Sequence, residues 1–298
     1  MSFEEGAGLD TSQVTGGGRG GALIGGGIGS LVLILIGAFF GIDLSGVTGS
    51  NNPFDPGQVQ PGGQESSQDF SQCKTGADAN RDVTCRVIGT VNSVQDYWND
   101  ALPAELGRQY RAAKTVLYSG ATQSACGTAS NQTGPFYCPS DERVYIDASF
   151  FDELTSRFGA DSGALAQEYV VAHEYGHHIE NILGLLGRAQ DGQTGPTSGG
   201  VRIELMADCL AGVWANHAST TKDADGNTLL KELTDRDIRS ALSAAAAVGD
   251  DHIQQSTSGG VNPDTWTHGS SESRQRWFLT GYKAGTANQC DTFSTNQL

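Results

Sequence analysis

Residues 166–180 read AQEYVVAHEYGHHIE and contain the pattern H-E-x-x-H at His173, Glu174 and His177. On a helix, side chains four residues apart share a face, so the two imidazoles project in the same direction. Two imidazoles one turn apart can bind one zinc ion, and Glu174 then lies beside the place of a zinc-bound water. The alternative is a polar helix face that matches the pattern by chance. A zinc site needs a fold that brings a further ligand to this helix.

The third ligand is expected on a following helix. The metzincin pattern requires Gly and His at the third and sixth positions after the second histidine, where this chain has Glu180 and Leu183. Residues 201–214 have helical periodicity and contain Glu204, and Asp208 follows one turn later, where it could accept the N–H of a zinc-bound imidazole. The alternative for both carboxylates is a solvated helix face. Their neighbours are mostly apolar, however, and a buried carboxylate needs a partner or a metal.

Four stretches of the chain together carry a resemblance to a known family. They are GPFYCP at 134–139 with VYID at 144–147, AHEYGHH at 172–178, ELMADCLAG at 204–212 and THGSSESRQRW at 267–277. In these stretches the chain resembles the family described as putative neutral zinc metallopeptidases, which are bacterial and commonly membrane-anchored. The likeness covers residues 70–295 and the layout of the N-terminal segment.

The resemblance implies a gluzincin-type site in a zincin-like α+β fold with a small sheet and an active-site helix. One Zn²⁺ ion would be held by His173, His177 and Glu204, and the sequence departs from the family pattern at none of them.

The predicted chemistry is hydrolysis of a peptide bond in a peptide or protein substrate. Three protein ligands leave a position for water, and zinc lowers the pKa of that water to about 7. Glu174 would accept the proton and return it to the leaving amine. His268, in the THGSS segment, is the candidate donor to the oxyanion, and the alternative is that it structures the start of a helix.

Two other functions fit the same residues. One is a non-catalytic, zinc-braced envelope module that would bind a partner through its surface. A closed four-ligand zinc site would favour this function, which would have no need of Glu174. A hydrolase for a non-peptide substrate also fits, because the chemistry of the site does not name the bond that is cut.

Residues 1–72 divide by composition into three segments before the zinc metallopeptidase domain at residues 73–298. Residues 1–21 carry few apolar side chains and are expected to form a disordered tail. Residues 22–42 are uncharged and long enough to cross ~30 Å of hydrocarbon as a transmembrane helix. Residues 43–72 are rich in Gly, Pro, Asn, Gln and Ser and are typical of a flexible linker.

The uncharged stretch also sets the expected location. Arg19 is the one basic residue before it, so the positive-inside rule places the N-terminus in the cytoplasm. We therefore expect a single-pass protein of the cell membrane, anchored by this helix, with its catalytic domain outside the cytoplasm. The alternative is a cleaved signal peptide with its apolar core at residues 31–42.

The net charge of −16, with 18 Lys and Arg residues, argues against binding to nucleic acid. Phosphate backbones are bound by clustered basic side chains, which this chain lacks.

The six cysteines are an even number in a chain expected to be exported, which favours disulfides. Cys73 with Cys85 and Cys126 with Cys138 would close short loops, and Cys209 would then pair with Cys290 by elimination. Reduced, buried cysteines are the alternative if the domain faces the cytoplasm.

Periodicity predicts a few elements before the zinc helix. Residues 90–106 are typical of a helix that Pro103 interrupts. Residues 115–118 and 143–147 favour strands, and we expect the second to be a sheet edge that pairs with an extended substrate. Ordinary core packing is the alternative for Tyr145 and Ile146.

Overall fold

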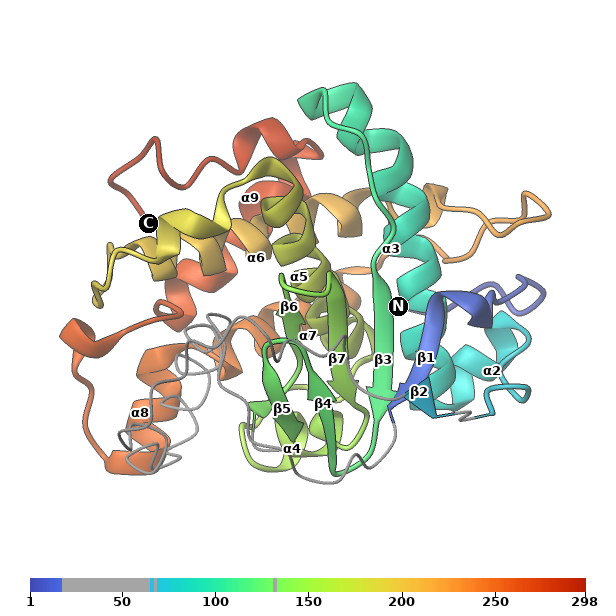
Figure 1. Ribbon diagram of the computed structural model, residues 1–298, viewed down its shortest axis with the longest axis horizontal. Coiled ribbons are helices and arrows are strands. Elements are labelled where there is room, and N and C mark those ends of the chain that lie inside the picture. The colour runs from blue at the N-terminus through green and yellow to red at the C-terminus, as the bar shows by residue number, and fades with distance from the viewer. Residues whose placement is uncertain (18–64, 67–68, 131–132) are drawn as a thin grey trace, which may run out of the picture. The chain divides into compact units, whose positions relative to one another are not determined.

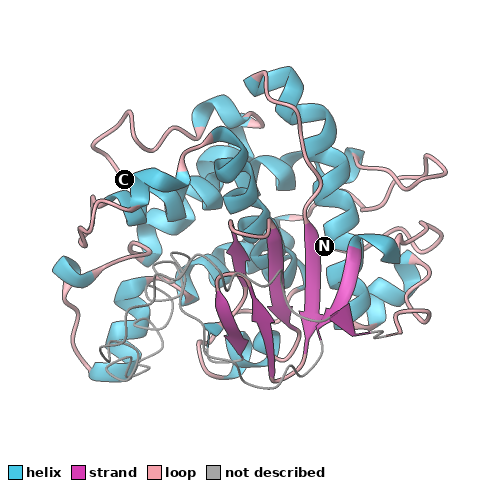
Figure 2. Ribbon diagram, viewed as in Figure 1, coloured by secondary structure: helices cyan, strands magenta, loops and turns pink. Residues whose placement is uncertain are grey.

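The computed structural model describes residues 1–17, 65–66, 69–130 and 133–298. It divides into two compact units. Unit 1 comprises Met1–Gln13, Phe70–Ala112 and Phe151–Leu298, and unit 2 comprises Val14–Asp69 and Ala113–Phe150. Helices predominate in unit 1 and the described strands lie in unit 2, so the predicted α+β class is confirmed (Figure 2).

The main sheet of unit 2 has five strands in the order β2-β1-β3-β7-β6 (Figure 1). Its strands are β1 (Val14–Gly17), β2 (Glu65–Ser66), β3 (Lys114–Tyr118), β6 (Phe136–Cys138) and β7 (Arg143–Asp147). The strands β1, β3 and β7 run parallel, while β2 and β6 pair antiparallel at the two ends. A hairpin of β4 (Ala121–Ser124) and β5 (Gly127–Ser130) forms a second, two-stranded sheet.

Both predicted strands are present, but the role expected for the second one is wrong. The strand β7 lies between β3 and β6, so its backbone is already paired on both sides and cannot accept an extended substrate. Tyr145 and Ile146 are buried, and the Tyr145 ring stacks on Phe136 with centroids 5.1 Å apart. Core packing is therefore the correct interpretation of these two residues.

The helices of unit 1 carry most of the chain. They are α2 (Gly76–Arg81), α3 (Val83–Leu106), α5 (Ala164–Leu183), α6 (Gly199–His217), α7 (Asp235–Ala247), α8 (Asp250–Ser258) and α9 (Ser271–Ala284), and α4 (Phe150–Ser156) begins at the boundary of the two units. Short 3₁₀ turns lie at Thr11–Gln13, Leu186–Ala189, Ala218–Thr220, Pro263–Thr265 and Ala287–Gln289. The helix α6 packs against both α5 and α9, and α5 also packs against α3 and α7.

The ends of these helices follow from local side-chain chemistry. The helix α3 begins earlier than predicted because Asp82 accepts a hydrogen bond from the Cys85 N–H, as an N-cap residue does. Pro103 lies in its last turn without ending it, and Gly107, in the left-handed conformation, closes the helix. The N-cap of α9 is Ser270, whose hydroxyl accepts a hydrogen bond from the Ser273 N–H.

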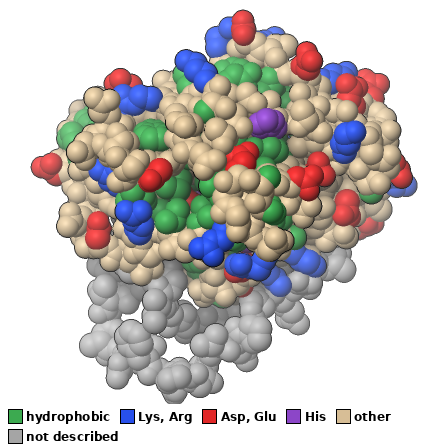
Figure 3. All heavy atoms as spheres, turned by 90° about the horizontal axis from the view of Figure 1, so that it is seen from above, with side chains coloured by type: hydrophobic (Ala, Val, Ile, Leu, Met, Phe, Trp, Pro, Cys, Tyr) green, Lys and Arg blue, Asp and Glu red, His purple; other side chains and the backbone are tan. Residues whose placement is uncertain are grey.

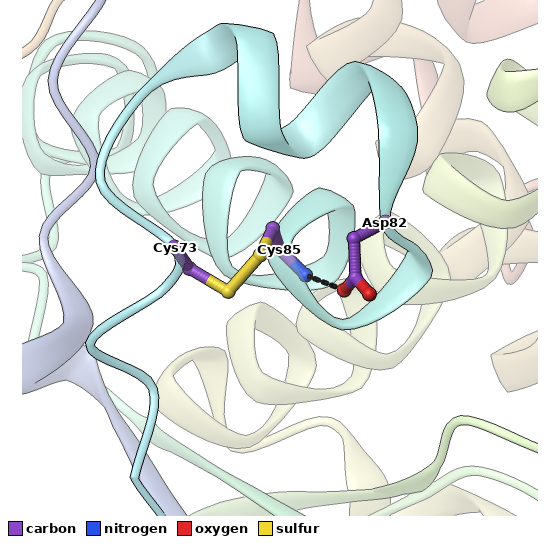
Figure 4. A group of neighbouring side chains, drawn as sticks. All are labelled: Cys73, Asp82 and Cys85. Carbon is purple, nitrogen blue, oxygen red and sulfur yellow. Dashed lines mark hydrogen bonds between the residues drawn. A yellow bond between two sulfur atoms is a disulfide. The ribbon is translucent and has the colours of Figure 1, made fainter.

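The disulfides are the predicted ones: Cys73–Cys85, Cys126–Cys138 and Cys209–Cys290. Figure 4 shows the first of them beside Asp82. Cys73, Asp82 and Cys85 lie close enough together to resemble a metal site. We do not assign a metal site to these groups, because the two sulfurs are bonded to each other and the carboxylate caps α3.

The prediction of a disordered tail is wrong for residues 1–17. Met1, Phe3 and Ala7 are buried in unit 1, and residues 14–17 form a strand of the sheet of unit 2. The segment has few apolar side chains, but each of these three is inserted into the core, and the neighbouring backbone is hydrogen-bonded. The domain therefore does not begin at Cys73.

The predicted transmembrane helix at 22–42 lies outside the described residues, as does most of the predicted linker at 43–72. In the described part of that range, Glu65–Ser66 forms strand β2 and Phe70 is buried, so the flexible-linker prediction is wrong there. Among the helices that are described, none combines the length and the apolar character that a membrane crossing requires.

Acidic and basic side chains are interspersed on the face shown in Figure 3, between larger areas of uncharged side chains and backbone.

Candidate metal centre

The site lies wholly within unit 1, where α5 and α6 cross. Gly176, inside the H-E-x-x-H segment, makes this crossing close, because a Cβ atom on it would lie only 2.9 Å from the Ala207 Cα atom of α6. A side chain at this position would push the helices apart. Glycine therefore brings the α6 carboxylates within reach of the α5 imidazoles.

His173, His177 and Glu204 meet at this crossing, as predicted. One ligand atom from each of the three lies within 4.8 Å of the others. The His173 Nε2 atom is 3.1 Å from Glu204 Oε2, and the His177 Nε2 atom is 3.6 Å from Glu204 Oε1. Both imidazoles thus direct the same nitrogen toward the same carboxylate, which is the arrangement that a shared cation requires.

The opposite nitrogen of His173 is held by the predicted partner, Asp208. Its Nδ1 atom lies 2.9 Å from Asp208 Oδ1. An N–H at Nδ1 leaves Nε2 with a free lone pair, so this contact selects the tautomer that can bind a metal.

Asp208 is itself fixed by two buried side chains, Arg274 and Tyr169. Arg274 of α9 donates from Nε to Oδ2 at 2.8 Å and from Nη2 to Oδ1 at 3.0 Å, and the Tyr169 hydroxyl also donates to Oδ1. Burial opposes ionisation of Asp208, but the guanidinium and His173 outweigh it and lower the pKa of the carboxyl. Asp208 is thus anchored as a carboxylate.

His177 has a carboxylate partner of its own, which sequence reasoning missed. Glu180 lies one turn along α5, and its Oε2 atom is 2.8 Å from His177 Nδ1. The side chain is fully buried, and among the described residues its Oε1 atom has no hydrogen-bond partner. The spacing of three residues on one helix could have revealed the pair, but Glu180 was considered only as a departure from the metzincin pattern.

The electrostatics of the site favour a cation on the Nε2 side. Burial, followed by the negative charge of Glu204, raises the pKa of Glu180 well above its usual range. Burial alone would lower the pKa of His173, but Asp208 and Glu204 raise it to about 10. In the protein without a metal ion, a proton on His173 therefore supplies the positive charge that balances Asp208 and Glu204.

Glu174 is buried next to the ligands, and burial raises its carboxyl pKa. A carboxylate with a raised pKa is a better proton acceptor than an exposed one, because its conjugate acid is closer to neutrality.

His268 lies near the same centre. Burial lowers its pKa, but the charge of Glu204 and the hydrogen bond and charge of Asp250 together outweigh burial and raise it, and His268 in turn contributes to the low pKa of Glu204. Its backbone is fixed by Asp250, whose Oδ2 atom accepts the N–H groups of Thr267, His268 and Gly269 at 2.8, 2.7 and 2.8 Å.

The other histidines have structural partners. His178 is fully buried, and its Nε2 atom contacts the Arg111 carbonyl oxygen, so it is a satisfied helix residue. His217 and His252 similarly bond to backbone carbonyl oxygens.

These residues fit a zinc ion. Zinc prefers ligands of these two types, histidine and glutamate, each imidazole has a carboxyl group behind it, and the three ligands come from two helices, α5 and α6.

Comparison with known proteins agrees with this assignment. The model of the family described as "Putative neutral zinc metallopeptidase" matches residues 4–293, so the chain belongs to that family. The protein of Mycobacterium tuberculosis named "Uncharacterized protein Rv2575" is 53% identical over 260 residues, covering 87% of this chain and 85% of that protein. The Escherichia coli protein "Uncharacterized protein YpfJ" is 37% identical over 276 residues, covering 90% of this chain and 86% of that protein. No solved structure matches the chain.

Proposed function

We propose that the protein is a gluzincin-type zinc peptidase with a zincin-like catalytic unit, in which His173, His177 and Glu204 hold one zinc ion. The observation that carries the proposal is the double orientation of the histidines: both Nε2 atoms point at Glu204 while both Nδ1 atoms contact carboxylates. Membership of a zinc metallopeptidase family supports it.

Each residue then has a separate task in hydrolysis of a peptide bond. When bound, zinc supplies Lewis acidity that polarises the scissile carbonyl and acidifies the attacking water. Glu174 accepts a proton from that water and delivers it to the leaving amine, so one carboxyl serves first as base and then as acid. Its burial and raised pKa suit both steps.

His268 is proposed to donate a hydrogen bond to the oxyanion that forms on the carbonyl. Its raised pKa favours the protonated ring, which has two N–H donors. Asp250 accepts hydrogen bonds from the backbone N–H groups of residues 267–269, and these bonds fix the backbone that carries the ring before substrate binds.

We further propose that the protein acts outside the cytoplasm. Its six cysteines are all paired in disulfides, which persist in oxidising compartments and are rare in the cytosol. The proposed substrate is accordingly a peptide or protein encountered there.

A non-catalytic zinc module remains the competing function. It is disfavoured by Glu174, whose carboxylate is buried beside the ligands at a desolvation cost that a purely structural site has no reason to bear.

The test is cleavage of a peptide library by the full chain and by its Glu174→Gln variant, with zinc content measured in both. Glu272→Gln is the matched control, because the same substitution is made on an exposed side chain of α9. We expect the wild type and the control to cut and a chelator to stop them. Glu174→Gln should retain zinc and lose at least ~100-fold in rate. Zinc binding without cleavage in any of the proteins would favour the structural module, and absence of zinc from all of them would refute the site.

A further inference from the structure

Residues 2–10 lie in unit 1 with a turn at Glu5 and Gly6, and their backbone is bonded to distant parts of the chain. On one side, the Glu4 N–H donates to the Leu229 carbonyl at 2.9 Å, and the Lys231 N–H donates to the Ser2 carbonyl at 3.0 Å. These two bonds form a short antiparallel ladder to the loop that follows α6.

The other side of the segment is hydrogen-bonded to residues 74–76, next to Cys73, where the sequence analysis placed the start of the domain. The Leu9 N–H donates to the Lys74 carbonyl at 3.0 Å, and the Gly76 N–H donates to the Ala7 carbonyl at 2.8 Å. The segment thus links residues 74–76 to residues 229–231, two parts of unit 1 that lie far apart in the sequence.

Two asparagines hold the same segment by reciprocal pairs of bonds. Asn80 accepts from the Phe3 N–H at 2.8 Å and donates to the Phe3 carbonyl at 3.0 Å. Asn92, inside α3, makes the same pair of bonds to Asp10, both at 2.9 Å. A side-chain amide used in this way imitates a neighbouring strand, and each asparagine would lose both bonds if the segment left.

The helix α3 is shaped to receive Phe3. The Phe3 ring is 0% exposed, and a Cβ atom on Gly89 would lie 2.5 Å from it. Glycine leaves the space that the ring fills, so departure of the segment would open a cavity in the core.

The next residues are equally committed in unit 2. The strand β1 pairs with β3 on one side, where Val14 is opposite Thr115, and with β2 on the other, where Gly17 is opposite Glu65. Gly17 and Glu65, the described residues on either side of positions 18–64, therefore lie opposite each other on two paired strands.

We propose that residues 1–17 and residues 69–298 lie on the same side of any membrane with which the protein associates. A single crossing between residues 17 and 65 would separate β1 from β2 and β3, and would remove Phe3 from α3. The single-pass topology expected from Arg19, with the N-terminus in the cytoplasm and the catalytic domain outside it, is incompatible with this packing. The inference does not depend on the proposed activity.

The first test is hydrogen exchange of the full chain, in whichever cell fraction contains it. The amides of Phe3, Gly8 and Asp10 should exchange at least ~100-fold more slowly than in an unstructured peptide. Asn92→Ala should accelerate exchange at Asp10, whereas Asn99→Ala, on the exposed face of the same helix, should not. Exchange of residues 2–10 at the unstructured rate in the wild type would overturn the proposal.

The second test labels the exposed positions Glu5→Cys and Gln255→Cys in intact cells with a membrane-impermeant maleimide. Equal labelling, or equal protection, of the two positions supports the proposal. Labelling of one position with protection of the other would refute it, whatever peptidase assays show.

Discussion

Replacement of Glu180 by glutamine should separate zinc affinity from the stability of the metal-free protein. Glu180 is the hydrogen-bond partner behind His177, with its Oε2 atom 2.8 Å from Nδ1. A glutamine of the same shape can still accept a bond there, but it carries no charge, and its amide can rotate to present a donor that favours the wrong tautomer. Loss of such an outer partner typically weakens metal binding 10- to 100-fold, or about 1.4–2.7 kcal/mol.

The metal-free protein should respond in the opposite direction. Glu180 is fully buried, and its raised pKa means that the folded state binds its proton more tightly than the unfolded state does. The free energy of unfolding therefore falls as the pH rises from the ordinary carboxyl pKa toward the raised one. Glutamine removes this loss, so we expect the metal-free variant to equal or exceed the wild type in stability at pH 8, with little difference near pH 4.

The assay is competition with a chromophoric chelator for zinc, together with denaturant unfolding in EDTA at the two pH values. Glu272→Gln, at an 87% exposed side chain, is the control and should change neither quantity. A zinc dissociation constant within twofold of wild type would refute the role of Glu180. So would a loss of affinity matched by an equal loss of metal-free stability, because that result would indicate a general packing defect.

Three further predictions test the surroundings of the site. Arg274→Gln should cost about 3–5 kcal/mol of unfolding free energy, because it leaves Asp208 buried without its cation, and a cost below ~1 kcal/mol would contradict the bidentate pair. Cys290→Ser should cost roughly 4 kcal/mol, since Cys209–Cys290 spans 81 residues; the comparison is Cys85→Ser, whose disulfide spans 12 residues and should cost roughly 3 kcal/mol. Burial raises the pKa of Glu168 to about 7. The free energy of unfolding of Glu168→Gln should therefore exceed that of the wild type by up to ~3 kcal/mol at pH 8 and not differ near pH 4. A gain in stability independent of pH would exclude titration of Glu168 as its cause.

The centre of the site could be predicted from sequence because its information is local. H-E-x-x-H places two imidazoles on one helix face, and Glu204 and Asp208 are one turn apart on the next helix, so helical period alone aligns each pair. What brings the helices together is Gly176, and its importance is visible only once Ala207 is known to lie opposite.

The parts that were missed depend on contacts between residues far apart in the chain. The burial of Phe3 depends on Asn80 and Gly89, and neither can be recognised as its partner from composition. A polar, glycine-rich beginning is typical of disorder, and here that signal is overridden by reciprocal bonds from asparagine side chains to the backbone of Phe3 and Asp10, which only tertiary structure supplies. The same limit applies to β7, since the order of strands in a sheet is not encoded in any one of them.

The carboxylates around the two histidines explain why the site should be both costly without metal and selective for a cation. Arg274 is directed at Asp208, behind His173, and not at Glu204. The negative charge of Glu204 therefore remains available on the Nε2 side, where His173 and His177 converge. Burial makes uncompensated negative charge there expensive, which the raised carboxyl pKa values of Glu174 and Glu180 record, while Asp208 and Glu204 raise the pKa of His173. A dication at this point would relieve all of these at once. The free energy that burial of the carboxylates costs the metal-free fold is thus recovered as affinity for the ion that the proposed reaction requires.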